Sequence, residues 1–147
     1  MRGHRATLAA ILGLSLAVAA AGPAAAAPLK LRVTLSPAPM SFGTVAVGEQ
    51  SGTQILYATN RSPIPVRWVR SVFEARPSGT ITLDVAPPPA TCFDGTDYVI
   101  QPGQTCGLAI IAFTPDAKGT FYIDGVSRFT DGATTITVTS TAKGKGI

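Results

Sequence analysis

The chain has 147 residues, with twelve Lys and Arg, eight Asp and Glu, and one histidine. This length suits a single domain that follows an N-terminal leader. Two of the basic residues, Arg2 and Arg5, lie in that leader, so ten basic residues remain against eight acidic ones. Such an even balance of charge argues against a nucleic-acid-binding surface.

Residues 1–26 have the pattern of a secretory signal peptide. Arg2 and Arg5 precede an uncharged apolar run, and Ala24 to Ala26 offer small residues for cleavage after about Ala26. No cysteine lies near that point, and no later apolar run is long enough to span a membrane. We therefore expect residues 27–147 to form one secreted or extracytoplasmic domain, with no membrane span.

Cys92 and Cys106 are the only two cysteines. In an exported chain, two cysteines predict one disulfide. Closing a loop of about fifteen residues contributes roughly 3 kcal/mol to stability.

From Leu29 onward, short apolar segments alternate with Gly, Pro, Asn and Asp, which is typical of an all-β sandwich. No apolar period of 3.6 persists, so we expect almost no helix. The segment from Ile100 to Pro115 is the most apolar, and we expect it to form a buried strand joined at one end through Cys106. The other expected strands are 29–35, 41–49, 52–60, 66–73, 80–85, 119–123, 126–129 and 133–141.

Three local patterns give more specific predictions. In the strand 66–73, Val66, Trp68 and Val72 would share the inner face, with Arg70 at its rim. Asp124-Gly125 and Asp131-Gly132 would each form a hairpin turn. The tail 143–147 should fray.

Several motifs occur in the order found in one known family. They are Ser41 to Gly48, a strand that ends at Asn60, Pro102 to Cys106, and Phe113 to Pro115. In this order they resemble the choice-of-anchor D repeats, which belong with the immunoglobulin-like domains named after abnormal spindle protein and hydin.

The resemblance implies an immunoglobulin-like β-sandwich of seven to nine strands, acting as an adhesion, spacer or protein-binding module without conserved catalytic residues. It also implies structural roles for Phe42, Asn60, Cys106 and Phe113. Phe113 follows Cys106 by seven positions, whereas the family pattern has six, so a bulge would be needed to keep both side chains inward.

The sequence offers few candidate catalytic or metal-binding residues. The single histidine, His4, lies in the leader, which leaves no catalytic triad and no histidine metal site. Asp94 and Asp97 could bind calcium or form an acid/base pair, but Asp and Gly are also usual in a turn within a disulfide loop. We expect no enzymatic activity, no cofactor and no metal.

Four arginines near the sole tryptophan are candidate binding residues. Arg61, Arg67, Arg70 and Arg76 surround Trp68 in the sequence and could dock an acidic glycan. A solvated strand edge beside a core tryptophan would explain the same residues.

These observations predict an exported, non-enzymatic module that binds a protein or a cell-surface polymer, through a sheet edge or the loops at one end. The alternative is a carbohydrate-binding module that uses Trp68, Tyr57, Tyr98 and nearby arginines. An exposed Trp68 ring beside Tyr57 would favour this alternative, and a Trp68 ring inside the sandwich would count against it.

Overall fold

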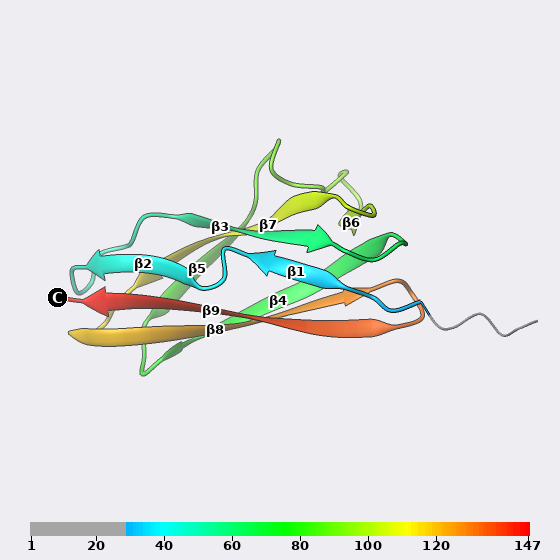
Figure 1. Cartoon of the computed structure of the whole chain (residues 1–147). Coiled ribbons are helices and arrows are strands. Elements are labelled where there is room, and N and C mark those ends of the chain that lie inside the picture. Colours follow the sequence, from blue (N-terminus) through cyan, green and yellow to red (C-terminus); the bar gives the residue numbers. More distant parts are fainter. Residues whose placement is uncertain (1–28) are drawn as a thin grey trace, which may run out of the picture.

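A computed structural model describes residues 29–147, and the predicted signal peptide lies outside these residues. The described part contains nine strands and no helix, which confirms the all-β class (Figure 1). It has no helix that could cross a membrane. The strands are β1 (Val33–Ser36), β2 (Met40–Val45), β3 (Gln54–Asn60), β4 (Val66–Arg76), β5 (Thr80–Val85), β6 (Val99–Ile100), β7 (Thr105–Thr114), β8 (Gly119–Thr130) and β9 (Thr135–Gly146).

The strands form two sheets that pack face to face. One sheet has the order β1-β3-β7-β5, and the other has the order β2-β9-β8-β4-β6. All neighbours are antiparallel except β2 and β9, which run parallel. Alternate residues of each strand point between the sheets, because successive side chains of a strand point to opposite faces.

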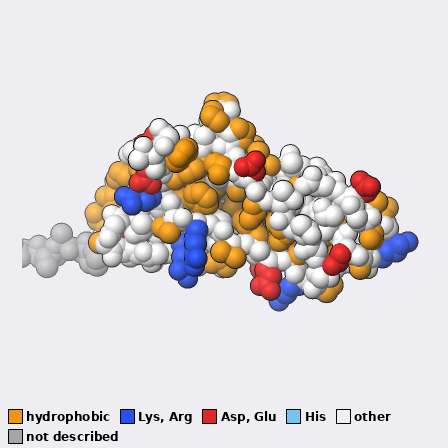
Figure 2. Space-filling view, turned by 180° about the vertical axis from the view of Figure 1, so that it is seen from behind, with side chains coloured by type: hydrophobic (Ala, Val, Ile, Leu, Met, Phe, Trp, Pro, Cys, Tyr) orange, Lys and Arg blue, Asp and Glu red, His pale blue; other side chains and the backbone are white. Residues whose placement is uncertain are grey.

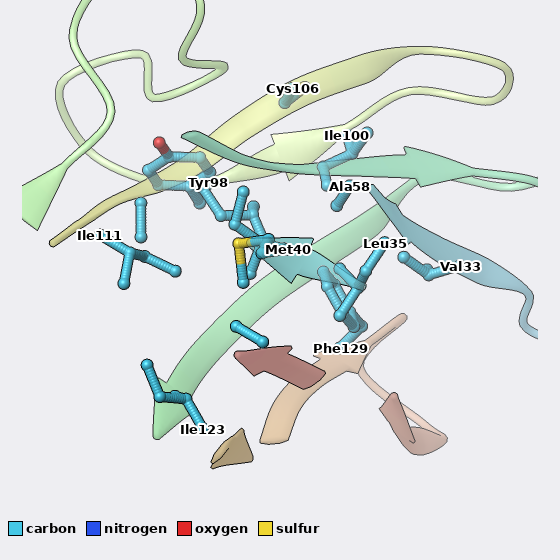
Figure 3. Close-up of a cluster of buried hydrophobic side chains, with 14 of the residues drawn as sticks. Val33, Leu35, Met40, Ala58, Tyr98, Ile100, Cys106, Ile111, Ile123 and Phe129 are labelled. Carbon is cyan, nitrogen blue, oxygen red and sulfur yellow. The ribbon is translucent and has the colours of Figure 1, made fainter. Parts of the chain in front are cut away.

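A cluster of apolar side chains fills the space between the sheets. Its centre holds Phe113, whose ring lies 5.1 Å from that of Phe121 and 6.2 Å from that of Phe42. Figure 3 shows the adjoining part of the cluster, to which strands of both sheets contribute. The cluster explains why the strand Thr105–Thr114 is almost wholly buried, as predicted.

A bulge in β7 resolves the seven-residue spacing between its cysteine and its phenylalanine. Leu56 pairs with Ala109 and Tyr57 pairs with Gly107, so Leu108 is an extra residue on β7. In a regular strand, two residues seven positions apart would point to opposite faces. The extra residue lets the side chains of Cys106 and Phe113 both point inward. Cys106 and Phe113 are consequently both fully buried.

The predicted disulfide is present. Cys92 in the link between β5 and β6 is bonded to Cys106 at the start of β7, with their Cα atoms 5.4 Å apart. Asn60 is also structural, as the resemblance implies, since its buried Nδ2 donates to the carbonyls of Ile64 and Ile100 at 2.8 and 2.9 Å. These contacts fix the two loops at one end of the sandwich.

The first strand is shorter than predicted. Leu31, Val33 and Leu35 are buried in alternation, but strand pairing begins only at Val33, and Leu29 is exposed. The alternation therefore identified the inner face correctly and placed the start of the strand too early.

The hairpin predicted at Asp124-Gly125 is wrong. β8 runs without interruption from Gly119 to Thr130, and Asp124 and Gly125 pair with β4 on one side and β9 on the other. A Cβ at Gly125 would lie 2.3 Å from Ser140 Oγ, so this glycine is needed for close packing. The turn predicted at Asp131-Gly132 does join β8 to β9.

The tail does not fray as predicted. Residues up to Gly146 belong to β9, and the backbone of Ile147 bonds to Val45 and Val47 of the β2 segment at 3.0 and 3.1 Å. Gly144 and Gly146 are buried, and their missing side chains let the strand pass close to Phe113 and Phe121. The composition of the tail had suggested disorder, whereas its glycines serve packing.

A second bulge changes the faces of β4. Trp68 pairs with Phe129 and Arg70 pairs with Arg128, so Val69 is an extra residue. Trp68 thus points inward, whereas Val72 is 54% exposed on the outer face with Arg70. The prediction that Val72 shares the inner face of Trp68 is wrong, because alternation counted from Trp68 fails at the bulge.

Candidate binding groove between β4 and β5

One side of the sandwich is left open by its strand order. β5 is the edge strand of the first sheet, and β6, at the edge of the second, pairs only with Val66 and Arg67 of β4. The backbone of Trp68 still donates to the Tyr98 carbonyl at 2.9 Å. Beyond that point, within the described residues, β4 has no strand on this side.

The inner face of β5 is apolar yet poorly covered. Ile81, Leu83 and Val85 alternate on this face, and Leu83 and Val85 pair with Ile111 and Ala109 of β7. Leu83 remains 44% exposed and Val85 51% exposed. An inward-facing apolar side chain in a sandwich is normally covered by the opposite sheet, which does not reach these two residues.

The space between the two edges is an open cavity of about 240 Å³. Figure 2, which views the molecule from behind, shows apolar side chains gathered across the middle of this side. We call this cavity the β4–β5 groove. It is lined by Trp68, Ser71 and Phe73 from β4, by Leu83, Asp84 and Val85 from β5, and by Leu108 and Ala109 from β7.

Trp68 forms the floor of the groove at its β6 end. The ring is half-buried, and its Nε1 donates to Ser71 Oγ at 3.1 Å. Tyr98 packs against it edge to face, with ring centroids 4.9 Å apart. Trp68 is therefore held at the inner face of β4, in the lining of the groove.

The link between β5 and β6 supports this end of the groove. Tyr98 is buried, and its hydroxyl donates to the Gly107 carbonyl at 2.7 Å. Phe93 stacks on Tyr98 with ring centroids 5.7 Å apart and is largely exposed. Because Cys92 precedes Phe93 directly, the disulfide fixes this aromatic pair against β7.

The carboxylates of the link hold its turn. Asp94 Oδ1 accepts the backbone N–H groups of Thr96 and Asp97, both at 2.8 Å. These bonds, the one from Asp97 first, lower the pKa of Asp94 below its ordinary value because they stabilise the charged form. Asp97 Oδ2 lies 2.8 Å from Arg67 Nε. No group of three potential metal ligands occurs within residues 29–147.

The four candidate arginines do not converge on Trp68. Arg67 and Arg76 form ion pairs with Asp97 and Asp124, on the exposed surface. Arg70 stands beside Arg128 on the outer face of the sheet, opposite to the side toward which Trp68 points. Arg61 lines a separate hollow with residues of β1 and β9.

The aromatic platform expected of a glycan site is not assembled either. Tyr57 lies on β3 of the other sheet, where it pairs with Ser36 and Gly107. Tyr98 is buried behind Trp68. No two of these rings form an open, coplanar surface.

Of the residues that line the groove, only Trp68 was among the candidates from sequence. The alternation of Ile81, Leu83 and Val85 gave the strand and its inner face, but the same pattern is expected of a fully covered strand. What exposes Leu83 and Val85 is the short β6, because its two residues leave most of β4 uncovered.

The two sheets, their order and the core define an immunoglobulin-like β-sandwich. No family model matches the chain, and no curated protein matches it. Among solved structures, it is similar to the ASH / PapD-like domain of human CEP192 (PapD-like domain 7), with 15% identity and a TM-score of 0.53, over 92% of this chain and 97% of that chain.

Two proteases of Vibrio cholerae contain a similar region. The serine protease VesC matches with 15% identity and a TM-score of 0.53, over 80% of this chain and 23% of its own. VesB matches with 14% identity and a TM-score of 0.52, over 78% of this chain and 31% of its own. At these identities the likeness shows the fold.

Proposed function

We propose that this chain is an exported, non-enzymatic interaction module of the choice-of-anchor D kind, and that it binds an extended segment of a partner protein in the β4–β5 groove. The observation that carries the proposal is the exposure of Leu83 and Val85, which point inward from an edge strand and are each about half uncovered. The leader and the disulfide support export.

An extended peptide fits both features of the groove. A strand laid along β5 would pair with its free backbone edge, and every second side chain would enter the groove beside Phe73 and Leu108. The walls are mostly apolar, so these alternate side chains should be Val, Ile, Leu or Phe.

Asp84 regulates access to that edge. The Val85 N–H donates to the carboxylate Oδ1 of Asp84 at 2.7 Å, whereas the next N–H, that of Ala86, donates to the Leu108 carbonyl. Edge strands commonly carry charged side chains that discourage unspecific pairing. An incoming strand would displace this local hydrogen bond, which favours peptides with a good apolar fit.

The test uses short synthetic peptides in which Val, Ile, Leu or Phe alternate with Thr or Lys. Binding should protect Trp68 from acrylamide and shift its emission, because Trp68 is the single tryptophan and lies in the groove. Leu83→Lys should weaken binding by about tenfold or more, since it places a charge against the apolar wall.

Thr82→Lys is the matched control, because it adds the same charge on the outward face of the same strand. It should bind as the unmodified protein does. If no alternating peptide binds, or if Leu83→Lys binds equally well, the groove is not the peptide site.

A further inference from the structure

The outer face of the second sheet carries its charges in rows. Between β4 and β8, Arg70 lies opposite Arg128, and Glu74 lies opposite Asp124. Between these rows, Val72 lies opposite Val126. Like charges directly opposite each other destabilise a sheet, so the stability of the single chain does not account for this arrangement.

These side chains are available for contact. Val72 is 54% and Val126 38% exposed, and Arg70, Arg128 and Glu74 are exposed. Within the described residues, Arg70, Arg128 and Glu74 form no ion pair, while Asp124 pairs with Arg76. The face therefore presents a basic row, an apolar row and an acidic row, spaced two residues apart along the strands.

The order of these rows makes this face complementary in charge to the same face of a second copy. We propose that this face binds a second copy of the chain, face to face, about a two-fold axis that runs along the Val72–Val126 row. This rotation reverses the direction of the strands but keeps each strand above its own counterpart. It therefore places Arg70 over Glu74 of the second copy and Arg128 over Asp124 of the second copy, and the converse contacts follow by symmetry.

The next row on β4 would place Arg76 over Arg67 of the second copy, where each arginine already pairs with a carboxylate of its own chain. The neighbours on β9 are compatible with the contact. On β9, Thr137, Thr139 and Thr141 continue the three rows without charge, so they add neutral contact area. Aligned sheets pack with their strands within about 30° of each other, and the rows closest to the axis stay in register at such an angle. The two Val rows would meet on the axis and exclude water there.

A second copy explains the rows better than an anionic polymer does. A polymer would be attracted to Arg70 and Arg128 but repelled by Glu74 and Asp124 one short step away. The dimer does not use the β4–β5 groove, because it engages outward-facing side chains of β4 whereas the groove is lined by inward-facing ones.

The test measures association of the purified protein by sedimentation equilibrium, from roughly 1 μM to 1 mM, the range of weak to moderate affinities. Arg70→Glu places a carboxylate over Glu74 of the second copy, and Glu74→Arg places a guanidinium over Arg70 of the second copy. Each substitution alone should weaken association by about tenfold or more, because two attractive contacts become repulsive.

Mixing the two variants gives the sharpest result. In a mixed pair, every contact between positions 70 and 74 again joins opposite charges, so the mixture should associate as the unmodified protein does. Arg61→Glu and Glu49→Arg make the same charge changes at exposed positions away from this face and should leave association unchanged. The proposal is overturned if the unmodified protein stays monomeric, if either single variant associates as tightly as the unmodified protein, or if the mixture associates no more tightly than the single variants.

Discussion

Gly125 lies in the middle of β8, where the packing leaves no space for a side chain. A Cβ there would lie 2.3 Å from Ser140 Oγ and 2.5 Å from the Phe73 ring. Gly125→Ala should destabilise the domain by about 1–3 kcal/mol, the usual range for overpacking. Urea unfolding measures this, with Gly52→Ala as the control, because a Cβ at Gly52 meets nothing within 4 Å. Equal midpoints for the two variants would contradict this account of Gly125.

The sequence predicts single residues well only where alternation is unbroken. Leu31, Val33 and Leu35 are buried as their spacing indicates. Val69 and Leu108 are bulged, and each shifts the faces of the residues that follow it. A bulge depends on the register with the neighbouring strand, and the spacing of residues along one strand carries no information about that register. The unusual distance from Cys106 to Phe113 was the single sign of a bulge in the sequence.

At the scale of elements, the C-terminal strand gives a second prediction. The Ile147 N–H donates to the Val45 carbonyl and the Val47 N–H donates to the Ile147 carbonyl, so both amides should exchange slowly with deuterium. Lys118, in the bend between β7 and β8, is the reference for a rapidly exchanging amide. If Ile147 exchanges as fast as Lys118, the tail is frayed after all.

Turn signals in the sequence succeed or fail according to their neighbours. Asp131-Gly132 forms a turn as predicted, and the Asp131 carboxylate holds it by accepting the N–H groups of Ala133 and Thr134. Asp124-Gly125 has the same composition but lies between β4 and β9, which pair with it on both sides. Local turn propensity is overridden there by two ladders of hydrogen bonds and by the need for a small residue beneath Phe73.

For the whole molecule, removal of the disulfide should lower the free energy of unfolding by roughly 3 kcal/mol, because the unfolded chain regains the freedom of a loop of about fifteen residues. The double variant Cys92→Ala with Cys106→Ala tests this by urea unfolding. The unmodified protein in excess reductant should shift to the same extent. An unchanged midpoint in both samples would show that the bond between Cys92 and Cys106 does not hold the fold.

The sandwich class is predictable from sequence because it follows from local alternation and turn residues, and the resemblance adds the expected number of strands. The candidate site is not predictable from sequence, because the groove exists only where a strand ends early and leaves its neighbours uncovered. The order β1-β3-β7-β5 puts Leu83 and Val85 at an edge, and the two-residue β6 leaves them uncovered. Trp68 lines the groove, but the arginines near it in the sequence do not converge on its ring.

Under the proposed function, the bond between Cys92 and Cys106 would also determine when the end of the groove beside Trp68 becomes ordered. Tyr98, which packs against Trp68, and Phe93, which stacks on Tyr98, belong to the link that this bond fastens to β7. In a reducing compartment the link is held only by its weaker contacts, and the apolar wall is less well ordered. Under the proposed function, a newly made chain would therefore bind poorly before this bond forms and competently once it has formed.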